Sequence, residues 1–544
     1  MVIAFSSPSS ISTSFNYNAR SKHTIGFVQF PSISTFCLSS NRSLPRITIS
    51  SCQHSSKFHH INELDNEFLH ELPIPRWHRG SKVFVTLPFD TLDSQGKIKK
   101  LKVLTYSLKS LSLAGVEGIV MEVYWGLVEK YLPLSYDWRG YLEIVALARH
   151  FGLKVRAVLA FHELGVAGSS CWIPLPYWVR HAMLEEPDMA FSDRFGRKNK
   201  EYISFGCDVL PVLKGRSPIQ TYSDFMKSFR DTFKEYLGIT VTGVQVGMGP
   251  AGELRYPSCP SHKLASSWRT RELGEFHCYD KYMLASLNAC AQNMGMHEWG
   301  NSGPLGTGNL MHNPEETKFF KSDGSWNTPY GRFFLEWYSG MLLLHGERLC
   351  MAAENVFWGT GVSISTKLAG MHWHYRTDSH PSELTAGYYN TSVRDGYLPI
   401  ARMLAKYGVT MCCTWFELLD SDEKEVHPHS SPEGLLRQIL LAARACDLPF
   451  DGGNSGETFN ERSLQQVLRM TKFYSEGLDE LFFSFNFVRM GKTLFDRQNW
   501  ACFTAFVQEI SRVGNVQAKL NLRVQLSAPS TSTIKRTRTG IAYC

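Results

Sequence analysis

Eight short apolar runs, rich in β-branched and aromatic residues, recur along the chain, and an amphipathic stretch follows most of them. They lie at 83–88, 119–126, 155–162, 241–250, 363–373, 409–417, 446–454 and 481–490. The first three begin about 36 residues apart, which is the length of one strand–helix unit. Buried parallel strands read as near-continuous apolar runs, so the pattern predicts an α/β fold: a closed (β/α)₈ TIM barrel with long loops at its C-terminal face.

An open, doubly wound sheet is the alternative arrangement of the same elements. It would require a glycine fingerprint for a phosphate group after the first strand, and "LPFDTLDSQGK" contains no GxGxxG. The barrel is therefore the better interpretation. A chain of 544 residues is within the range of a single barrel with insertions.

Polar residues stand near the end of almost every run, where a barrel of this type carries its functional side chains. In chain order they are Asp90, Glu122, His162, Glu253, Lys367, His372, Thr414, Glu417, Asn454 and Arg489, with Trp125 and Trp373 beside them. Any one of them could be an ordinary surface or salt-bridge residue. Because they all come together at the C-terminal end of the predicted barrel, its mouth, they predict a functional site there. The aromatic share of 13% fits either a large core, the commoner reason, or a carbohydrate groove.

Several motifs are similar to those of one enzyme family. "GMGPAGELRYPSCP" (247–260), "VEGIVMEVYWGLVE", "GEFHCYDKYM", "FFLEWYSGMLLLHG", "SELTAGYYN" and "DGYLPIARM" resemble plant β-amylases, and the resemblance covers residues 80–512. It implies the β-amylase (β/α)₈ barrel. It also implies a reaction that removes maltose, with inversion, from the non-reducing ends of α-1,4-glucans.

An inverting glycosidase uses two carboxyl groups, one to protonate the leaving oxygen and one to activate a water. By resemblance Glu253 is the general acid, presented by a turn of Gly249, Pro250 and Gly252. The family's general base is the glutamate of a "GEN" motif after the seventh strand. Here that motif reads Gly452-Gly453-Asn454, so Gly453 stands at the position of the base.

Two nearby carboxylates could replace the lost base. Asp451 shares a strand face with Gly453 but lies about 6.6 Å back along the strand, and Glu457 lies four residues on. The resemblance also implies a flexible, glycine-rich loop that acts as a lid over the substrate. The matching segment here, "FHELGVAGSSCWIPLP" (161–176), is one residue shorter than the family loop and places Ser169 where the resemblance implies an aspartate. A lid without that carboxylate is expected to close less productively around substrate.

The residues that the resemblance assigns to glucose binding are mostly retained. Glu122 replaces an aspartate, which we expect to shift the innermost subsite, and Ser455 replaces an alanine. The predicted substrate-binding set is Glu122, His162, Ser169, Lys367, His372, Trp373, Thr414, Asn454, Ser455 and Arg489.

No cofactor or metal is predicted. "HWHY" (372–375) and "HPH" (427–429) could suggest a metal site, but alternate residues of a strand face opposite ways and His372 already has a role by resemblance. The 13 cysteines form neither a CxxC pair nor a ligand pattern, so reduced thiols are expected. No apolar run approaches the roughly 20 residues of a membrane span.

The two ends differ in composition from the rest. Residues 1–62 contain no Asp or Glu, and residues 1–56 include 16 Ser, which is typical of an organelle transit peptide and here predicts a plastid leader over residues 1–60 and a stromal protein. A leader without function is the alternative. Residues 513–544 form a basic, low-complexity tail with no predicted role. Residues 1–57 and 513–544 each hold five Lys or Arg and no acid, which together exceeds the formal charge of +7, so the barrel is mildly acidic and predicts no nucleic-acid partner.

Three functions remain open from the sequence. The first is a plastid protein that binds starch or maltooligosaccharides with little or no hydrolysis, and acts as a sensor or as a modulator of active starch-degrading enzymes. The second is a weakly active β-amylase that uses Asp451 or Glu457. The third, a nuclear regulator, would resemble β-amylase-like proteins that carry an N-terminal DNA-binding domain, but no basic helical module precedes residue 80.

Overall fold

Eight parallel strands form a closed barrel, as the apolar runs predicted. A computed structural model describes residues 80–512, except 170, 260–272, 311, 424–426, 458 and 477–481, so the predicted leader and tail lie outside the described residues. The barrel order is β1-β10-β9-β8-β7-β6-β3-β2. The strands are β1 (Lys82–Thr86), β2 (Gly118–Tyr124), β3 (Lys154–Ala160), β6 (Val241–Val246), β7 (Ser363–Lys367), β8 (Thr410–Cys413), β9 (Phe450–Gly453) and β10 (Phe483–Phe487).

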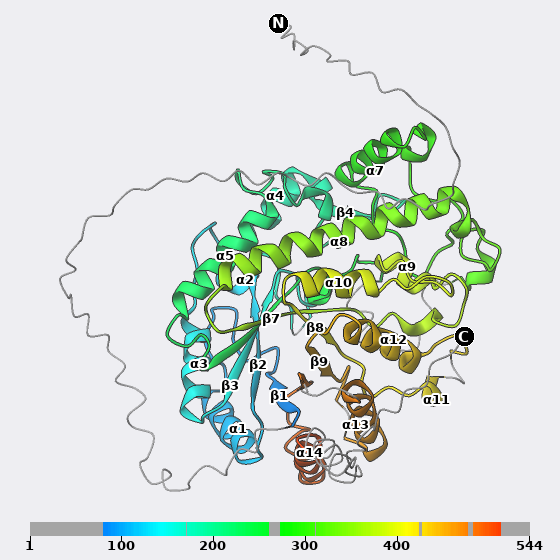
Figure 1. Ribbon diagram of the computed structural model, residues 1–544. Coiled ribbons are helices and arrows are strands. Elements are labelled where there is room, and N and C mark those ends of the chain that lie inside the picture. The colour runs from blue at the N-terminus through cyan, green and yellow to red at the C-terminus, as the bar shows by residue number, and fades with distance from the viewer. Residues whose placement is uncertain are drawn as a thin grey trace, which may run out of the picture. The chain divides into compact units, whose positions relative to one another are not determined.

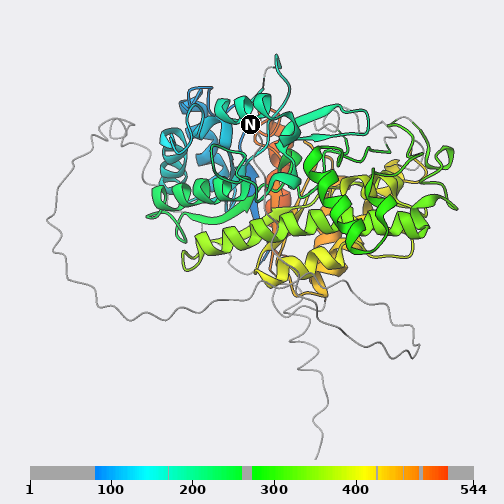
Figure 2. The same cartoon turned by 90° about the horizontal axis from the view of Figure 1, so that it is seen from above.

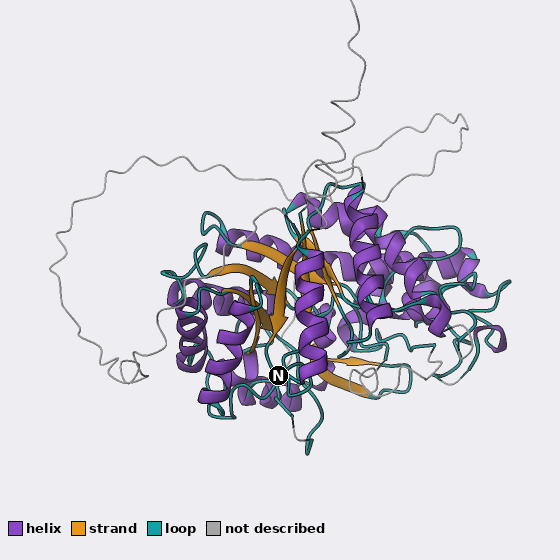
Figure 3. Ribbon diagram, turned by 90° about the horizontal axis from the view of Figure 1, so that it is seen from below, coloured by secondary structure: helices purple, strands orange, loops and turns teal. Residues whose placement is uncertain are grey.

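Helices surround this barrel and alternate with its strands along the chain (Figures 1 and 3). They are α1 (Leu101–Leu113), α2 (Trp125–Val128), α3 (Arg139–His150), α4 (Tyr177–Glu185), α5 (Pro218–Thr232), α7 (Lys281–Asn293), α8 (Pro329–Phe357), α9 (Pro381–Ala386), α10 (Leu398–Lys406), α11 (Asp420–Glu423), α12 (Pro432–Arg444), α13 (Glu461–Ser475) and α14 (Arg497–Ile510). Helix α8 is the long yellow-green helix of Figure 2.

Local sequence explains where these helices begin and which face they bury. Helix α5 starts with a capping box of Ser217 and Gln220, with Pro218 in its first turn, so its first amides are satisfied. Helix α10 buries Ile400, Ala401 and Leu404, whose spacing places them on one face of a helix. Among the described residues, no helix is long and apolar enough to cross a membrane.

One element was not foreseen from the sequence. An antiparallel hairpin, β4 (Ala190–Ser192) and β5 (Lys198–Ile203), lies outside the barrel sheet in the long connection between β3 and β6. Its Glu201 accepts a hydrogen bond from the backbone amide of Ala251, at 2.8 Å. The hairpin therefore supports the turn that carries Glu253.

Candidate functional site

Glu253 follows a strained turn at the end of β6. The 3₁₀ turn Pro250–Gly252 contains Ala251 at φ +54°, a left-handed conformation that is uncommon for a residue with a side chain. The hydrogen bond that the Ala251 amide donates to Glu201 holds it there. Glu253 is then paired on both oxygens. Its Oε2 accepts from Nε of the fully buried Arg255 at 2.8 Å, and its Oε1 lies 3.3 Å from Nζ of Lys367. The acid predicted from sequence is rigidly placed between two cations.

Gly453 is the last residue of β9 and is buried. It pairs with Asn486 of β10, and its carbonyl accepts from the backbone amide of Phe416. A Cβ added here would lie 3.1 Å from the carbonyl oxygen of Asn486 and 3.3 Å from Cγ2 of Thr414. A longer side chain therefore needs a shift of a few tenths of an ångström, but its backbone is not in the left-handed region.

Asp451 does not extend toward the mouth of the barrel. Its Oδ1 lies 2.9 Å from a guanidinium nitrogen of Arg156 and accepts from the hydroxyl of Ser484 at 2.5 Å, with the carboxylate only 7% exposed. Strands β9 and β3 are on opposite sides of the eight-stranded barrel, so this ion pair crosses the interior. A carboxylate held in this way is poorly placed to activate a water above Gly453.

The other nearby carboxylates are also differently placed. Glu457 is exposed and lies beside Gly491, after β10. Glu417 is buried, and its Oε1 accepts from both the amide (2.8 Å) and the hydroxyl (2.5 Å) of Ser455, while burial raises its pKa. Neither carboxylate stands where the side chain of residue 453 would begin.

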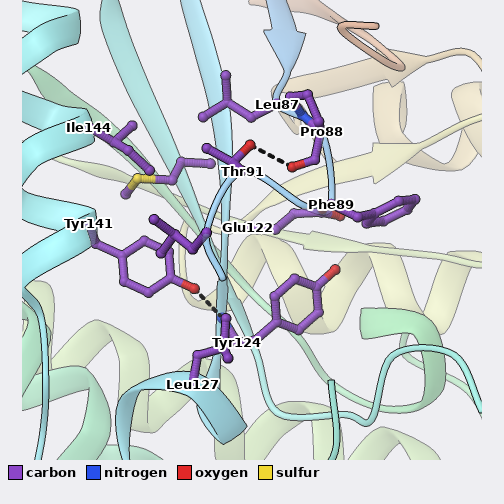
Figure 4. Close-up of a pocket in the computed structure, with 11 residues that line it drawn as sticks. Leu87, Pro88, Phe89, Thr91, Glu122, Tyr124, Leu127, Tyr141 and Ile144 are labelled. Carbon is purple, nitrogen blue, oxygen red and sulfur yellow. Dashed lines mark hydrogen bonds between the residues drawn. The ribbon is translucent and has the colours of Figure 1, made fainter. Parts of the chain in front are cut away.

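Glu122 and Arg489 close one side of the mouth together. The Arg489 guanidinium donates to both Glu122 oxygens, at 2.9 and 3.4 Å, donates to the carbonyl of Leu87, and lies 3.4 Å from the centre of the Phe89 ring. The space beside Glu122 is small, about 20 Å³, which is room for about one water. Figure 4 shows its lining, with Tyr141 bonded to the Tyr124 amide. A glucose ring must therefore bind elsewhere in the mouth, or separate this pair.

The predicted histidine ligands are buried, Trp373 is half-buried, and both kinds of side chain offer polar atoms. Within the part of the chain that the structure describes, Nδ1 of His162 and Nε1 of Trp373 are buried without a hydrogen-bond partner. His372 lies against Trp373, with Nδ1 2.9 Å from the Ser430 hydroxyl. Unpartnered buried nitrogens are costly unless a ligand uses them, which supports a polar ligand here.

We predict that acid destabilises the protein through its buried histidines. Burial lowers the pKa of His162, His372 and His374 to about 3, and for His162 the nearby Lys367 and Arg255 contribute to this shift. Below pH 6.5 the unfolded chain takes up protons that the folded chain refuses, so stability falls as pH decreases and levels off near pH 3. Each histidine contributes about 1.4 kcal/mol per pH unit in this window.

Thermal melts at pH 7.5 and pH 5 measure this effect. The His374→Gln variant is expected to lose less stability between these two pH values than the unchanged protein. The exposed His181, with 64% of its side chain accessible, provides the matched control His181→Gln, which should keep the full slope. Equal melting temperatures at both pH values for the unchanged protein would contradict the prediction.

Asn454 and Ser455 link the segments that follow neighbouring strands through hydrogen bonds. The Asn454 side chain is 1% exposed, donates to the carbonyls of Gly456 and Val488, and accepts from the Val488 amide. It thereby fixes the chain immediately before Arg489. Ser455 is bound to Glu417, and Thr414 stands beside Gly453. Their predicted sugar contacts stay predictions.

The lid is a short loop with a fixed base. Leu164 and Ile173 exchange backbone hydrogen bonds at 2.9 Å, and the Trp172 indole donates to Glu163. Ser169 lies at the exposed tip, where its amide donates to the carbonyl of Val166. Ser169 has no hydrogen bond with another predicted ligand among the described residues, and its predicted contact with substrate stays a prediction.

The tertiary structure corrects one expectation and adds residues that were missed. Trp125 does not lie beside the mouth, because it begins α2 and is fully buried against Phe161 and Trp178. Arg255 and Glu201 were missed. Arg255, two residues after Glu253, had a sequence signal in that spacing, whereas Glu201 lies 50 residues from its partner and had none.

The described residues contain no group of three or more His, Cys, Asp or Glu placed to hold a metal ion. The histidines of "HWHY" are engaged separately, His372 with Ser430 and His374 with Ser382. The cysteines in the described ranges are free thiols.

Comparison with known proteins gives a consistent assignment. The family model described as glycosyl hydrolase family 14 matches residues 84–516. "Beta-amylase 1, chloroplastic" of Arabidopsis thaliana is 47% identical over 437 residues, covering 79% of this chain and 76% of that protein. "Inactive beta-amylase 4, chloroplastic" of the same plant is 40% identical over 446 residues, covering 80% and 83%. The catalytic domain of a beta-amylase from Paenibacillus polymyxa has the same fold, with a TM-score of 0.64 at 24% identity, over 79% of this chain and 98% of that one.

Proposed function

The chain belongs to glycosyl hydrolase family 14, and from this premise we propose that it binds the non-reducing ends of α-1,4-glucans at the barrel mouth but hydrolyses them far more slowly than an enzyme with two catalytic carboxyls. One observation carries this proposal: the residue at the end of β9, where the base is expected, is Gly453. Binding is supported by the unpartnered nitrogens of His162 and Trp373.

The proposed chemistry follows from what each side chain can do. Glu253 can donate a proton to a glycosidic oxygen, and Lys367 and Arg255 orient its carboxyl. A water on the opposite face of the sugar still has to lose a proton as it attacks. Asp451 is paired with Arg156, and Glu417 is bound to Ser455, so neither is preorganised for this task. General acid–base groups contribute about 10²–10⁴-fold to a rate, and we expect the loss to lie in this range.

A weakly active β-amylase is the second candidate, and the relatives favour it. The chain is 47% identical to a protein named beta-amylase and 40% identical to one named inactive. Overall identity therefore does not group the chain with inactive members. In this candidate Glu457, which is exposed and beside Gly491, would approach the water when glucan binds.

We place the protein in the plastid stroma. Two observations support this location: the relatives above carry the word chloroplastic in their names, and the acid-free, serine-rich residues 1–60 have the composition of a transit peptide. A protein that holds glucan ends there without releasing maltose rapidly would report on, or modulate, starch breakdown by active enzymes.

One purified sample tested for both binding and hydrolysis separates the candidates. Calorimetry with maltotetraose is expected to show binding at millimolar or lower ligand, and maltose release from soluble starch is expected to be near background. The variant His162→Ala should bind about 10-fold more weakly, because it removes a buried ligand nitrogen. Absence of binding at about 10 mM maltotetraose would refute the glucan site, and maltose release clearly above background would establish the second candidate.

A further inference from the structure

A second depression lies outside the mouth, immediately after the residues predicted to contact glucose. It has a volume of about 510 Å³, within the usual range of small-molecule sites. Its first lining residue, Tyr375, directly follows the 3₁₀ turn His372–His374, which contains two of the predicted sugar ligands. The opposite wall is the turn that contains Ser392 and Arg394, just before α10.

The lining is polar, and both of its arginines are already paired. Arg376 and Arg394 are each paired with a carboxylate outside the depression, Asp420 at 2.7 Å and Glu336 at 3.0 Å. Asp378 and Asp395 add two negative charges to the lining itself. An anionic ligand such as a phosphate would thus find no available cation, and a neutral ligand with many hydroxyl groups suits the mixture of donors and acceptors.

His380 lines the depression with a side chain that is 6% exposed. Its Nδ1 lies 2.7 Å from the Glu383 carboxylate and 3.3 Å from the side-chain amide of Asn390. Beside it lies the half-buried ring of Tyr375, 5.1 Å between centroids, which offers an apolar surface of the kind that packs against a sugar ring.

The two walls are fixed relative to each other, so the depression is formed before a ligand arrives. The Ser392 amide donates to the carbonyl of Asp378 at 3.0 Å, and Thr391 and Arg394 close their turn with two backbone bonds. Below them, Asn390 and Gln438 exchange side-chain hydrogen bonds at 2.8 and 3.1 Å. Preformed walls reduce the ordering cost of binding.

We propose that this depression is a second glucan-binding site, which holds a neutral α-1,4-linked oligosaccharide segment alongside the one at the mouth. The ligand class rests on the proposed function, whereas the existence of the site rests on the depression itself. A protein with two such sites would hold a glucan chain more firmly than one with the mouth alone.

Calorimetry of the full chain with maltoheptaose tests the proposal, using variants whose folding is checked by thermal melts. The unchanged protein is expected to bind two molecules. Ser392→Trp, which fills the depression with an exposed side chain, should remove one of them, and Asp378→Ala, whose carboxylate makes no contact among the described residues, should weaken it about 10-fold. The matched control Asp231→Ala removes a carboxylate that is 66% exposed elsewhere and should change nothing.

The variant Lys367→Met removes a ligand at the mouth and distinguishes the two proposals. Retention of one bound maltoheptaose in Lys367→Met supports the second site. A single site in the unchanged protein, or unaltered binding in both Ser392→Trp and Asp378→Ala, overturns the second site and leaves the mouth intact. Loss of all binding in Ser392→Trp, with none lost in Lys367→Met, supports the depression but refutes the glucan site at the mouth.

Discussion

The variant Gly453→Glu is expected to release maltose from soluble starch at least 10²-fold faster than the unchanged protein. The substitution restores a proton acceptor opposite Glu253, and acid–base groups of this kind contribute about 10²–10⁴-fold. The nearest atoms to a new Cβ are the Asn486 carbonyl oxygen at 3.1 Å and the Thr414 methyl at 3.3 Å, so the side chain enters once these neighbours shift by a few tenths of an ångström. Chromatography of the released maltose over time gives the rate.

Two controls show whether the gain is chemical. Gly453→Gln has nearly the same shape but accepts no proton, so it should stay at the rate of the unchanged protein. Adding Glu253→Gln to Gly453→Glu should abolish the gain, because inversion needs both carboxyls. If Gly453→Glu folds and binds maltotetraose but releases maltose as slowly as Gly453→Gln, the missing base does not limit the rate of hydrolysis in this protein.

The variant Asp451→Asn is expected to lose about 3–5 kcal/mol of stability with little effect on glucan binding. It leaves the Arg156 guanidinium, 18% exposed, without its counter-charge in the barrel interior, and breaking a buried pair on one side has this order of cost. Chemical denaturation followed by tryptophan fluorescence measures the change. Arg156→Met combined with Asp451→Asn should recover part of the loss, because no uncompensated charge then remains.

Asp323→Asn is the matched control for this experiment. Its carboxylate is 83% exposed and paired with Lys321 at the surface, so the change should stay within about 0.5 kcal/mol. If Asp451→Asn kept full stability but lost a residual maltose release, Asp451 would be the substitute base, and its structural role as the partner of Arg156 would be wrong.

The sequence alone could not show whether Asp451 replaces the general base that is missing at Gly453. Its position two residues before Gly453 predicts the same strand face, which is correct. Its partner, Arg156, lies 295 positions earlier in a strand on the far side of the barrel. No local pattern indicates that pairing, because it depends on the closure of all eight strands.

The eight apolar runs were sufficient to predict the barrel, since strand periodicity is a local property. The roles of Glu253 as the acid and of Gly453 at the position of the base follow from the resemblance of the "GELRYP" and "GGN" motifs to the family, and they stay predictions. The tertiary structure alone determined how each side chain is engaged: Glu253 between Arg255 and Lys367, Asn454 on the Val488 backbone, and Trp125 in the core rather than at the mouth. These contacts join segments far apart in the chain, and the position of each partner is set by packing that no single segment encodes.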